Sequence, residues 1–378
     1  MKKNRLTLIA AASLIMFALI LGACPPIDEE ESENGNSIDN PAMKKVEVAL
    51  GNDKWTEVLE EIKEKNQYVI LDLSACTAPA SNTGGGLTPD NKFNPISDSE
   101  TGKDKIVRVI LPDAAVEING DFHYFKNLKS ISGKNIRTII KNIFSNCSNL
   151  VSVEFPLLEG IPEEAFFMCT SLVTVEFYEM KGQIFKEAFM GCTSLEYARI
   201  PNASKIEEKA FSGCTSLKSV HFSNATDVGT RAFSDCTSLK SATFTNAASF
   251  QSTDKVFGGC TSLESVFITT AAGSAFKLGD NIFERTGSKK LTITLGEGPD
   301  AGTVGTRMFD NATGKTVVVK IKKGTWLSAT ATAAKMKDAF GGKGSIWLTA
   351  IANFDAGVGT ASGAGAVTPI TGITIQEY

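Results

Sequence analysis

Residues 210–222 read Ala-Phe-Ser-Gly-Cys-Thr-Ser-Leu-Lys-Ser-Val-His-Phe, and this stretch decides the fold because its pattern recurs along the chain. Six consecutive units share a phenylalanine, a cysteine three residues later and a leucine three residues after that. The six units are Phe144-Cys147-Leu150, Phe166-Cys169-Leu172, Phe189-Cys192-Leu195, Phe211-Cys214-Leu217, Phe233-Cys236-Leu239 and Phe257-Cys260-Leu263. Successive cysteines are 22, 23, 22, 22 and 24 residues apart. Such regular self-similarity predicts a repeat protein.

Each unit contains an alternating stretch after its leucine. Val220 and Phe222 fall on one side of an extended chain, whereas Ser219 and His221 fall on the other, which is the periodicity of a strand. Turn residues follow, and then comes an isolated apolar residue in several units. These apolar residues are Ile161, Ile184, Ile206 and Val228. The short Ala-Phe-x-x-Cys segment suits a single helical or 3₁₀ turn.

A single unit cannot bury its own apolar face, but stacked units can, because each strand pairs with the next at about 4.8 Å. A period of 22 to 24 residues falls within the leucine-rich-repeat range of about 20 to 29. We therefore predict an α/β repeat solenoid. It is a right-handed leucine-rich-repeat stack with a parallel sheet on the concave face and short turns or 3₁₀ segments on the convex side.

The repeat loosens at both ends, as expected for units that must cap an exposed core. Upstream, Phe122-Phe125-Leu128 keeps the spacing with phenylalanine in the cysteine position. Downstream, the cysteine is absent and the phenylalanines are farther apart, but strands are predicted at 291–295, 317–321 and 346–350.

The chain is predicted to begin with targeting and capping segments. A helix at 54–65 and a strand at 68–73 are expected to close the N-terminal end of the stack. We divide the chain into a signal peptide (1–23), an acidic tether (24–42), an N-terminal cap (43–120) with a long loop at 78–105, the solenoid (121–322), a C-terminal cap (323–354) and a low-complexity tail (355–378).

The N-terminus has the features of a secretory signal: three basic residues in the first five, an apolar run from Leu6 to Leu21, and small residues before a cut. The sequence Leu21-Gly22-Ala23-Cys24 resembles the lipobox of bacterial lipoproteins. That resemblance implies a diacylglyceryl-modified Cys24 as the mature N-terminus, anchored to a membrane by its acyl chains. The alternative is a plain secretory signal with an incidental cysteine. A transmembrane helix is not predicted, because about 20 apolar residues are needed to span a bilayer.

Charge and composition exclude some classes of function. The formal net charge is −4, and removal of residues 1–23 would take it to −7, so no basic footprint for nucleic acid is present. The acidic residues 25–40 cannot bury a core and are predicted to form a flexible tether. Two histidines in the whole chain argue against a histidine-based metal or acid–base site.

The cysteines lack the CxxC pairs typical of metal sites, and no cofactor is predicted. Stacking would place one cysteine per turn in a column. A ladder of small buried side chains is the preferred interpretation, and disulfides between neighbouring turns are the alternative. The segment Gly84-Gly85-Gly86 lacks the lysine of a phosphate loop. No catalytic constellation is found, so an enzyme is not predicted.

The Ala-Phe-x-x-Cys-x-x-Leu-x-x-Val-x-Phe pattern resembles the BspA-type leucine-rich-repeat surface proteins of bacteria. The close match covers about 143–268, and a weaker one about 121–350. The resemblance implies adhesion to host matrix or serum proteins or to other cells. On that basis the partners are predicted to be proteins, together with a membrane through the lipid anchor, and the location is the surface of the outer membrane. The alternative is a periplasm-facing protein that organises the envelope.

Binding would use the outward face of the strands, which is broad and rigid in such stacks. Two residues and four residues after each leucine, the side chains point outward. The candidate binding residues are Glu154, Glu176, Tyr197, Arg199, His221, Thr243 and Phe267. Tyrosine, arginine and phenylalanine are enriched at protein interfaces. The alternative for any one position is a merely solvated sheet face.

Overall fold

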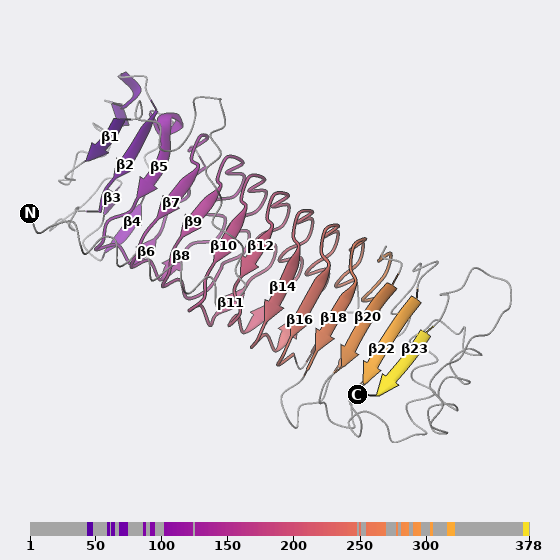
Figure 1. The fold of residues 1–378 in the computed structure, drawn as a ribbon. Coiled ribbons are helices and arrows are strands. Elements are labelled where there is room, and N and C mark those ends of the chain that lie inside the picture. Colours follow the sequence, from indigo (N-terminus) through magenta and orange to yellow (C-terminus); the bar gives the residue numbers. More distant parts are fainter. Residues whose placement is uncertain are drawn as a thin grey trace, which may run out of the picture. The chain divides into compact units, whose positions relative to one another are not determined.

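The structure is a computed structural model. It describes residues 44–47, 59–60, 62–64, 68–74, 86–87, 91–94, 102–123, 125–247, 249–250, 255–269, 277–278, 281–286, 290–295, 303–304, 316–321 and 373–377. The chain divides into two units, Met1–Ala42 and Met43–Tyr378, and every described residue belongs to the second. Within this unit each turn of the chain adds one strand beside the strand of the preceding turn (Figure 1). The fold is a parallel β-solenoid, which confirms the predicted stack of repeats.

The main sheet contains 13 strands, and every pairing in it is parallel. In sheet order they are β1 (Lys44–Glu47), β2 (Val69–Asp72), β5 (Ile106–Ile110), β7 (Ser130–Ser132), β9 (Ser152–Glu154), β10 (Thr174–Glu176), β12 (Tyr197–Arg199), β14 (Ser219–Phe222), β16 (Ser241–Phe244), β18 (Ser265–Ile268), β20 (Lys290–Leu295), β22 (Thr316–Ile321) and β23 (Ile373–Glu377).

Two smaller sheets are built from shorter strands. The six-stranded sheet contains β11 (Gln183–Ile184), β13 (Lys205–Ile206), β15 (Asp227–Val228), β17 (Ser249–Phe250), β19 (Lys277–Leu278) and β21 (Thr303–Val304). The four-stranded sheet contains β3 (Gly86–Leu87), β4 (Lys92–Asn94), β6 (Glu117–Ile118) and β8 (Thr138–Ile139). Of the isolated apolar residues of the repeat, Ile184, Ile206 and Val228 lie in short strands of their own, and Ile161 forms a single bridge to Ile184. The sequence pattern did not predict these strands.

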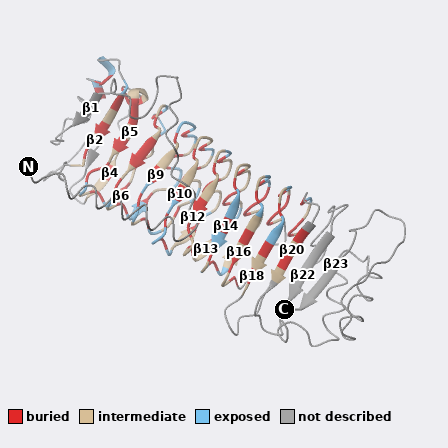
Figure 2. Ribbon diagram, in the orientation of Figure 1, coloured by how far each residue is buried: buried red, intermediate tan, exposed pale blue. Residues whose placement is uncertain are grey.

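Neighbouring strands pair so that each repeat position lies beside the same position of the next turn. Ser219 pairs with Ser241, and Phe222 with Phe244. Burial alternates along β14: Val220 and Phe222 are buried, whereas Ser219 and His221 are exposed (Figure 2). This alternation confirms which side of each strand faces the core.

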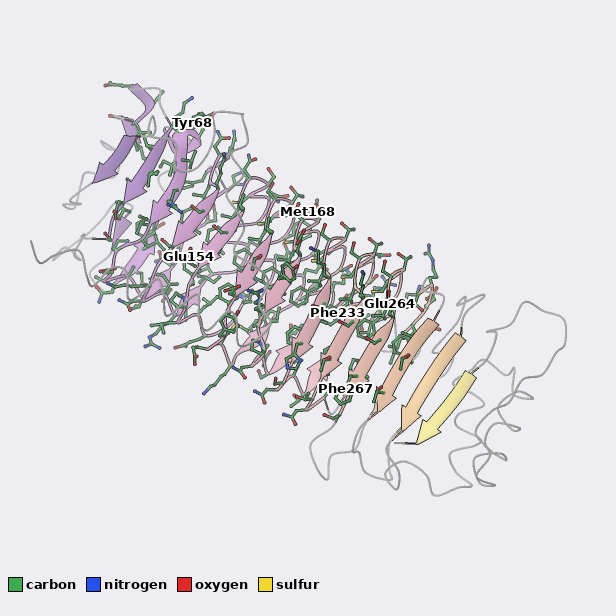
Figure 3. All side chains as sticks on the ribbon, in the orientation of Figure 1. Tyr68, Glu154, Met168, Phe233, Glu264 and Phe267 are labelled. Carbon is green, nitrogen blue, oxygen red and sulfur yellow. The ribbon has the colours of Figure 1, made fainter. Side chains whose placement is uncertain are left out.

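The phenylalanine that opens each repeat is buried and stacks on its counterparts in the turns before and after it. Eight rings form one column, with neighbouring centroids 5.1 to 5.7 Å apart (Phe233 is labelled in Figure 3). The column runs through Phe122, Phe144, Phe166, Phe189, Phe211, Phe233, Phe257 and Phe283. Offset or tilted ring pairs at this spacing add to the stabilisation that burial gives.

The backbone N–H groups around these phenylalanines donate hydrogen bonds to the following turn. Around Phe166, the N–H groups of Glu164, Phe166 and Met168 donate to carbonyls of the following turn at 3.1, 2.8 and 2.8 Å. Alternate N–H groups can point the same way because the residues two before and two after the phenylalanine adopt positive φ, 53° at Glu164 and 57° at Met168. Glycine takes this conformation without strain, and Gly213 and Gly259 fill the later of these positions in their turns.

The cysteines of the repeat are buried and free, and each thiol has a defined acceptor. The Cys192 Sγ–H donates to the Phe166 carbonyl, and Cys214 to the Phe189 carbonyl, both at 3.1 Å. The same Phe166 oxygen also accepts the Cys169 N–H at 3.2 Å. These contacts support the buried ladder over disulfides between turns.

Burial also makes the thiols poor nucleophiles. It raises the pKa of Cys147 to about 12 from an ordinary value of 9.0, with Asp121 adding to the increase. Burial likewise raises the pKa of Cys169, Cys192, Cys214 and Cys236. Since the thiolate is the reactive species, these thiols are held in an inert form at neutral pH.

The α/β label is not confirmed. Among the described residues, helix is confined to 59–60, 62–64 and the 3₁₀ turn η1 (Lys103–Lys105). The Ala-Phe-x-x-Cys segments form hydrogen-bonded turns, as in the 3.2 Å bond from the Cys169 N–H to the Phe166 carbonyl. Residues at positive φ on both sides of the phenylalanine prevent these turns from continuing as a helix.

The ends of the stack differ from expectation in two places. The segment predicted as a loop at 78–105 contains β3, β4 and η1, with Phe93 buried. The predicted strand at 346–350 lies outside the described residues. Instead β22 pairs with β23, which comes from the segment predicted as a tail. Two- and three-residue strands show too little alternation to be recognised in sequence.

Replacement of Phe211 by alanine should lower the free energy of unfolding by about 3–5 kcal/mol, because it leaves a cavity in the ring column. Denaturant unfolding measures this change. His221→Ala, at an exposed position of β14, is the control and should change the free energy by less than about 0.5 kcal/mol. If both substitutions changed the free energy of unfolding by the same small amount, the phenylalanine column would not be a main source of stability.

The Cys214 thiol should make stability depend on alkaline pH. Burial raises the pKa of this thiol in the folded state above its ordinary value of 9.0. The contribution of the thiol to stability is therefore fully present below pH 9.0. It is lost as pH rises above that value, because the unfolded chain then loses the proton while the folded chain keeps it. Relative to Cys214→Ser, the parent should lose about 1 kcal/mol more between pH 9 and pH 10. Thr215→Ser is the control and should follow the parent, whereas parallel curves for the parent and Cys214→Ser would contradict the prediction.

Candidate binding face of the main sheet

The sheet face is defined here as the outward side chains of β9, β10, β12, β14, β16 and β18. Every candidate binding residue named from the sequence lies on it. Glu154, Glu176 and His221 are exposed, whereas Tyr197, Arg199, Thr243 and Phe267 are half-buried. Glu154 and Phe267 are labelled in Figure 3.

The register brings some of these residues together across neighbouring strands. Glu176 pairs with Arg199 between β10 and β12. His221 pairs with Thr243, and Thr243 with Phe267, between β14, β16 and β18. The sheet therefore places six of the candidates in one column, one for each turn, and Tyr197 in the neighbouring column, beside Thr174 and Ser219.

A compact group of charged and aromatic side chains surrounds Tyr197. Arg199 forms an ion pair with Glu176, and its guanidinium lies 5.5 Å from the centre of the Tyr197 ring. The Lys218 ammonium lies 5.1 Å from the centre of the same ring and 3.4 Å from the Tyr197 hydroxyl. Two cations therefore lie against one aromatic ring, an arrangement in which the ring attracts both positive charges.

Acidic partners hold both cations in their charged form. Burial lowers the pKa of Arg199, but attraction and hydrogen bonding to Glu176, and a further contribution from Tyr178, raise it more. A hydrogen bond to Glu196, at 2.5 Å, raises the pKa of Lys218, and Tyr197 adds to the effect. We call this set the Tyr197 cluster; its members are Glu176, Tyr178, Glu196, Tyr197, Arg199 and Lys218.

Three members of the Tyr197 cluster are absent from the sequence-based candidates. Tyr178 lies just after β10 and retains 48% of its surface. Glu196 and Lys218 directly follow the leucines of their repeats. Extending the alternation two residues past Glu176 would have indicated Tyr178, but the contacts of Glu196 and Lys218 depend on side-chain conformation, which the pattern does not contain.

The remaining candidates are not part of this cluster. Glu154 lies exposed at the end of β9, one strand before β10. The His221 Nε2 lies 3.1 Å from the Ser223 hydroxyl, and Phe267 lies two strands farther along the sheet. Cys24, the candidate lipidation site, lies outside the described residues.

The described part of the chain contains neither a candidate metal site nor a candidate membrane-spanning helix. It holds no group of three or more histidine, cysteine, aspartate or glutamate side chains arranged to bind a metal ion. None of its helices has the length and apolar character needed to cross a membrane.

This chain is similar to solved structures of leucine-rich-repeat proteins, among them the following three. A leucine-rich cell surface protein from Faecalibacterium prausnitzii is 19% identical over 71% of this chain and 86% of its own, with a TM-score of 0.38. A leucine-rich-repeat protein from Bacteroides ovatus is 17% identical over 68% and 79%, with a TM-score of 0.44. A leucine-rich-repeat protein from T. pallidum is 20% identical over 68% and 92%, with a TM-score of 0.31.

A search of curated protein sequences finds no match. The family model of the BspA-type leucine-rich-repeat region matches residues 101–203 and 182–314, with six copies of the repeat. These ranges overlap and together cover more than half of the 378 residues. The chain therefore belongs to the BspA-type leucine-rich-repeat family.

Proposed function

We propose that this protein is held at the bacterial cell envelope and binds other proteins through the sheet face, with the Tyr197 cluster at the centre of the contact. The cluster is the observation that carries the proposal. It combines the exposed Tyr178 and the half-buried Tyr197 with an arginine and a lysine, and tyrosine and arginine are among the residue types enriched at binding hot spots.

The geometry of the cluster favours binding with a low entropic cost. Its side chains are already held by ion pairs and by cation–ring contacts before any partner arrives. The strands beneath them are fixed by parallel pairing on both sides. Less side-chain freedom is lost when preorganised groups bind, so more of the interaction energy remains as affinity.

The partners that fit this proposal are host matrix or serum proteins or the surfaces of other cells. Acylation of Cys24 would anchor the chain, and the acidic residues of the tether (24–42) would hold the solenoid away from the lipid surface. An envelope-organising protein that faces the periplasm is the second candidate, because the same anchor and binding face would serve it equally well. Both candidates bind rather than catalyse.

Tyr197→Ala should weaken binding to partner proteins by about tenfold or more, since hot-spot truncations cost about 2 kcal/mol. The measurement is solid-phase binding of the purified protein to a panel of immobilised matrix and serum proteins. Lys240→Ala, an exposed position on the neighbouring repeat, is the matched control and should bind as the parent does. The proposal would be contradicted if the parent protein bound no member of the panel. It would also be contradicted if both variants lost the same amount of affinity.

Cys24→Ala should abolish fatty-acid labelling and release the protein from the membrane fraction, because alanine has no thiol to which the diacylglyceryl group can be attached. Metabolic labelling with a radioactive fatty acid and cell fractionation measure both effects. Continued labelling of the variant would show that the anchor is elsewhere.

Protease treatment of intact cells distinguishes the two candidate functions. An adhesin must be exposed, so the parent protein should be cleaved on whole cells. Complete protection until the cells are lysed would favour the periplasm-facing candidate.

A further inference from the structure

A hollow of about 320 Å³ lies over the phenylalanine turns of the middle repeats, outside the sheet face. We call it the turn hollow. Its charged lining residues are Lys209, Arg231, Asp235, Lys255, Glu284 and Arg285. Its volume is at the lower end of the range for small-molecule sites.

The turn hollow exists because one repeat position changes from large to small side chains. The residue that directly follows each phenylalanine is Phe167 and then Met190 in two turns. In the next three turns the same position holds Ser212, Ser234 and Gly258. Phe167 and Met190 therefore fill the surface in their two turns, and it is open in the three turns that follow; the turn before them also has a small residue, Ser145.

Cations line one wall of the hollow. The residue two before the phenylalanine is Lys209, Arg231 and Lys255 in three successive turns, and all three have a φ of 54° to 57°. The turn-to-turn hydrogen bonds fix this backbone conformation, so the three side chains leave the stack at equivalent places. Each turn therefore contributes one cation. The turns themselves are spaced as the phenylalanine rings are, whose neighbouring centroids lie 5.3 and 5.7 Å apart here.

Ion pairs hold the two lysines in place. Lys209 Nζ lies 2.9 Å from Glu187, and Lys255 Nζ lies 3.2 Å from Glu284. The hydrogen bond to Glu187 raises the pKa of Lys209, which keeps this ammonium charged. Lys209 Nζ also lies 3.7 Å from Glu208. Each ammonium has three donors, so a donor remains for a ligand at both lysines. With Arg285, four cations and two acidic residues line the hollow of a chain whose net charge is −4.

The mixture of lining groups distinguishes between kinds of anion. Asp235 and Glu284 would repel a bare phosphate or sulfate ion. They would accept hydrogen bonds from the hydroxyls of a sugar, while the cations contact an acidic group on the same molecule. Ser212 offers a further hydroxyl, whereas the Ser234 hydroxyl donates to Asp235 at 2.8 Å, and Met190 offers an apolar surface to the C–H face of a ring. Every class of lining group therefore has a counterpart on an acidic sugar.

We propose that the turn hollow binds an acidic sugar unit, carboxylated or sulfated, within a polysaccharide that runs along the row of turns. The row of cations has one member per turn, and a sugar unit in an extended polysaccharide is about as long as one turn is thick. Successive acidic groups can therefore face successive cations. This site is separate from the sheet face and does not depend on the function proposed for it.

Titration calorimetry on the purified protein at low ionic strength tests the proposal with defined probes. A sulfated glycosaminoglycan tetrasaccharide represents the acidic sugars of host tissue. An oligogalacturonate represents carboxylated polysaccharides. Their relative affinities assign the source. Binding of either one, weakened by added salt, is the expected result. A neutral oligosaccharide, inorganic sulfate and a single-stranded oligonucleotide are the comparison probes, and each should bind at least about tenfold more weakly.

Two substitutions place the binding in the turn hollow. Ser212→Met should abolish binding by filling it, and the fold should tolerate this change because Met190 occupies the same position one turn earlier. Arg285→Gln should weaken binding by about tenfold, the effect of one charge-assisted hydrogen bond. Lys240→Gln, an exposed cation outside the hollow, is the control and should bind as the parent does. If Ser212→Met lowers the melting temperature markedly, Arg285→Gln decides.

Four outcomes would overturn the proposal. No binding of either acidic probe would show that the hollow has no such ligand. Equal binding of inorganic sulfate would reduce it to a simple anion site, and equal binding of the oligonucleotide would indicate a different class of macromolecule. An equal loss in Lys240→Gln would mean that the attraction is spread over the whole surface.

Discussion

The one-directional hydrogen bonds between turns are the constraint on which the rest of the structure depends. Around each repeat phenylalanine, alternate N–H groups donate to the following turn, as from Phe189 to Ala210 and from Gly191 to Ser212, each at 2.8 Å. These bonds fix the distance between turns, and that distance sets the stacking of the rings and the pairing of the strands. A non-glycine residue at positive φ costs of order 1 kcal/mol, yet glutamate, lysine and arginine recur there, so the bonds between turns must outweigh the strain.

Regular stacking separates the residues that build the scaffold from those that could recognise a ligand. The phenylalanine, cysteine and leucine of each repeat are buried, as Phe211, Cys214 and Leu217 show. Outward positions have no such role in the core, and they vary from turn to turn. The Tyr197 cluster and the turn hollow are both local departures from the repeat, and each uses residues from only a few successive turns. Their positions are fixed by the stack, whereas their chemistry is set by residues that the stack leaves free.

The sequence predicted the features that repeat many times and missed those that do not. The columns through Phe211 and Val220 follow from six matching units, and the register confirms them. The six-stranded sheet was missed because each of its strands has two residues, too few to show alternation. The position of β23 beside β22 joins segments far apart in sequence, which no local pattern contains. In the candidate site, the positions of Tyr197 and Arg199 were predictable, but their contacts with Lys218 and Tyr178 were not.

The chemistry of the cysteine ladder also bears on function. Cysteine is the most nucleophilic residue type in the repeat, and it recurs in six successive turns. All six side chains are buried, and the thiols donate to phenylalanine carbonyls such as that of Phe189. Burial raises the pKa of Cys214, so the thiolate needed for nucleophilic attack is disfavoured. Repetition of a catalytic group would require each copy to reach solvent, whereas repetition of a core residue requires each copy to be excluded from it. The ladder meets the second requirement, and for that reason the repeat favours a scaffold for binding over one for catalysis.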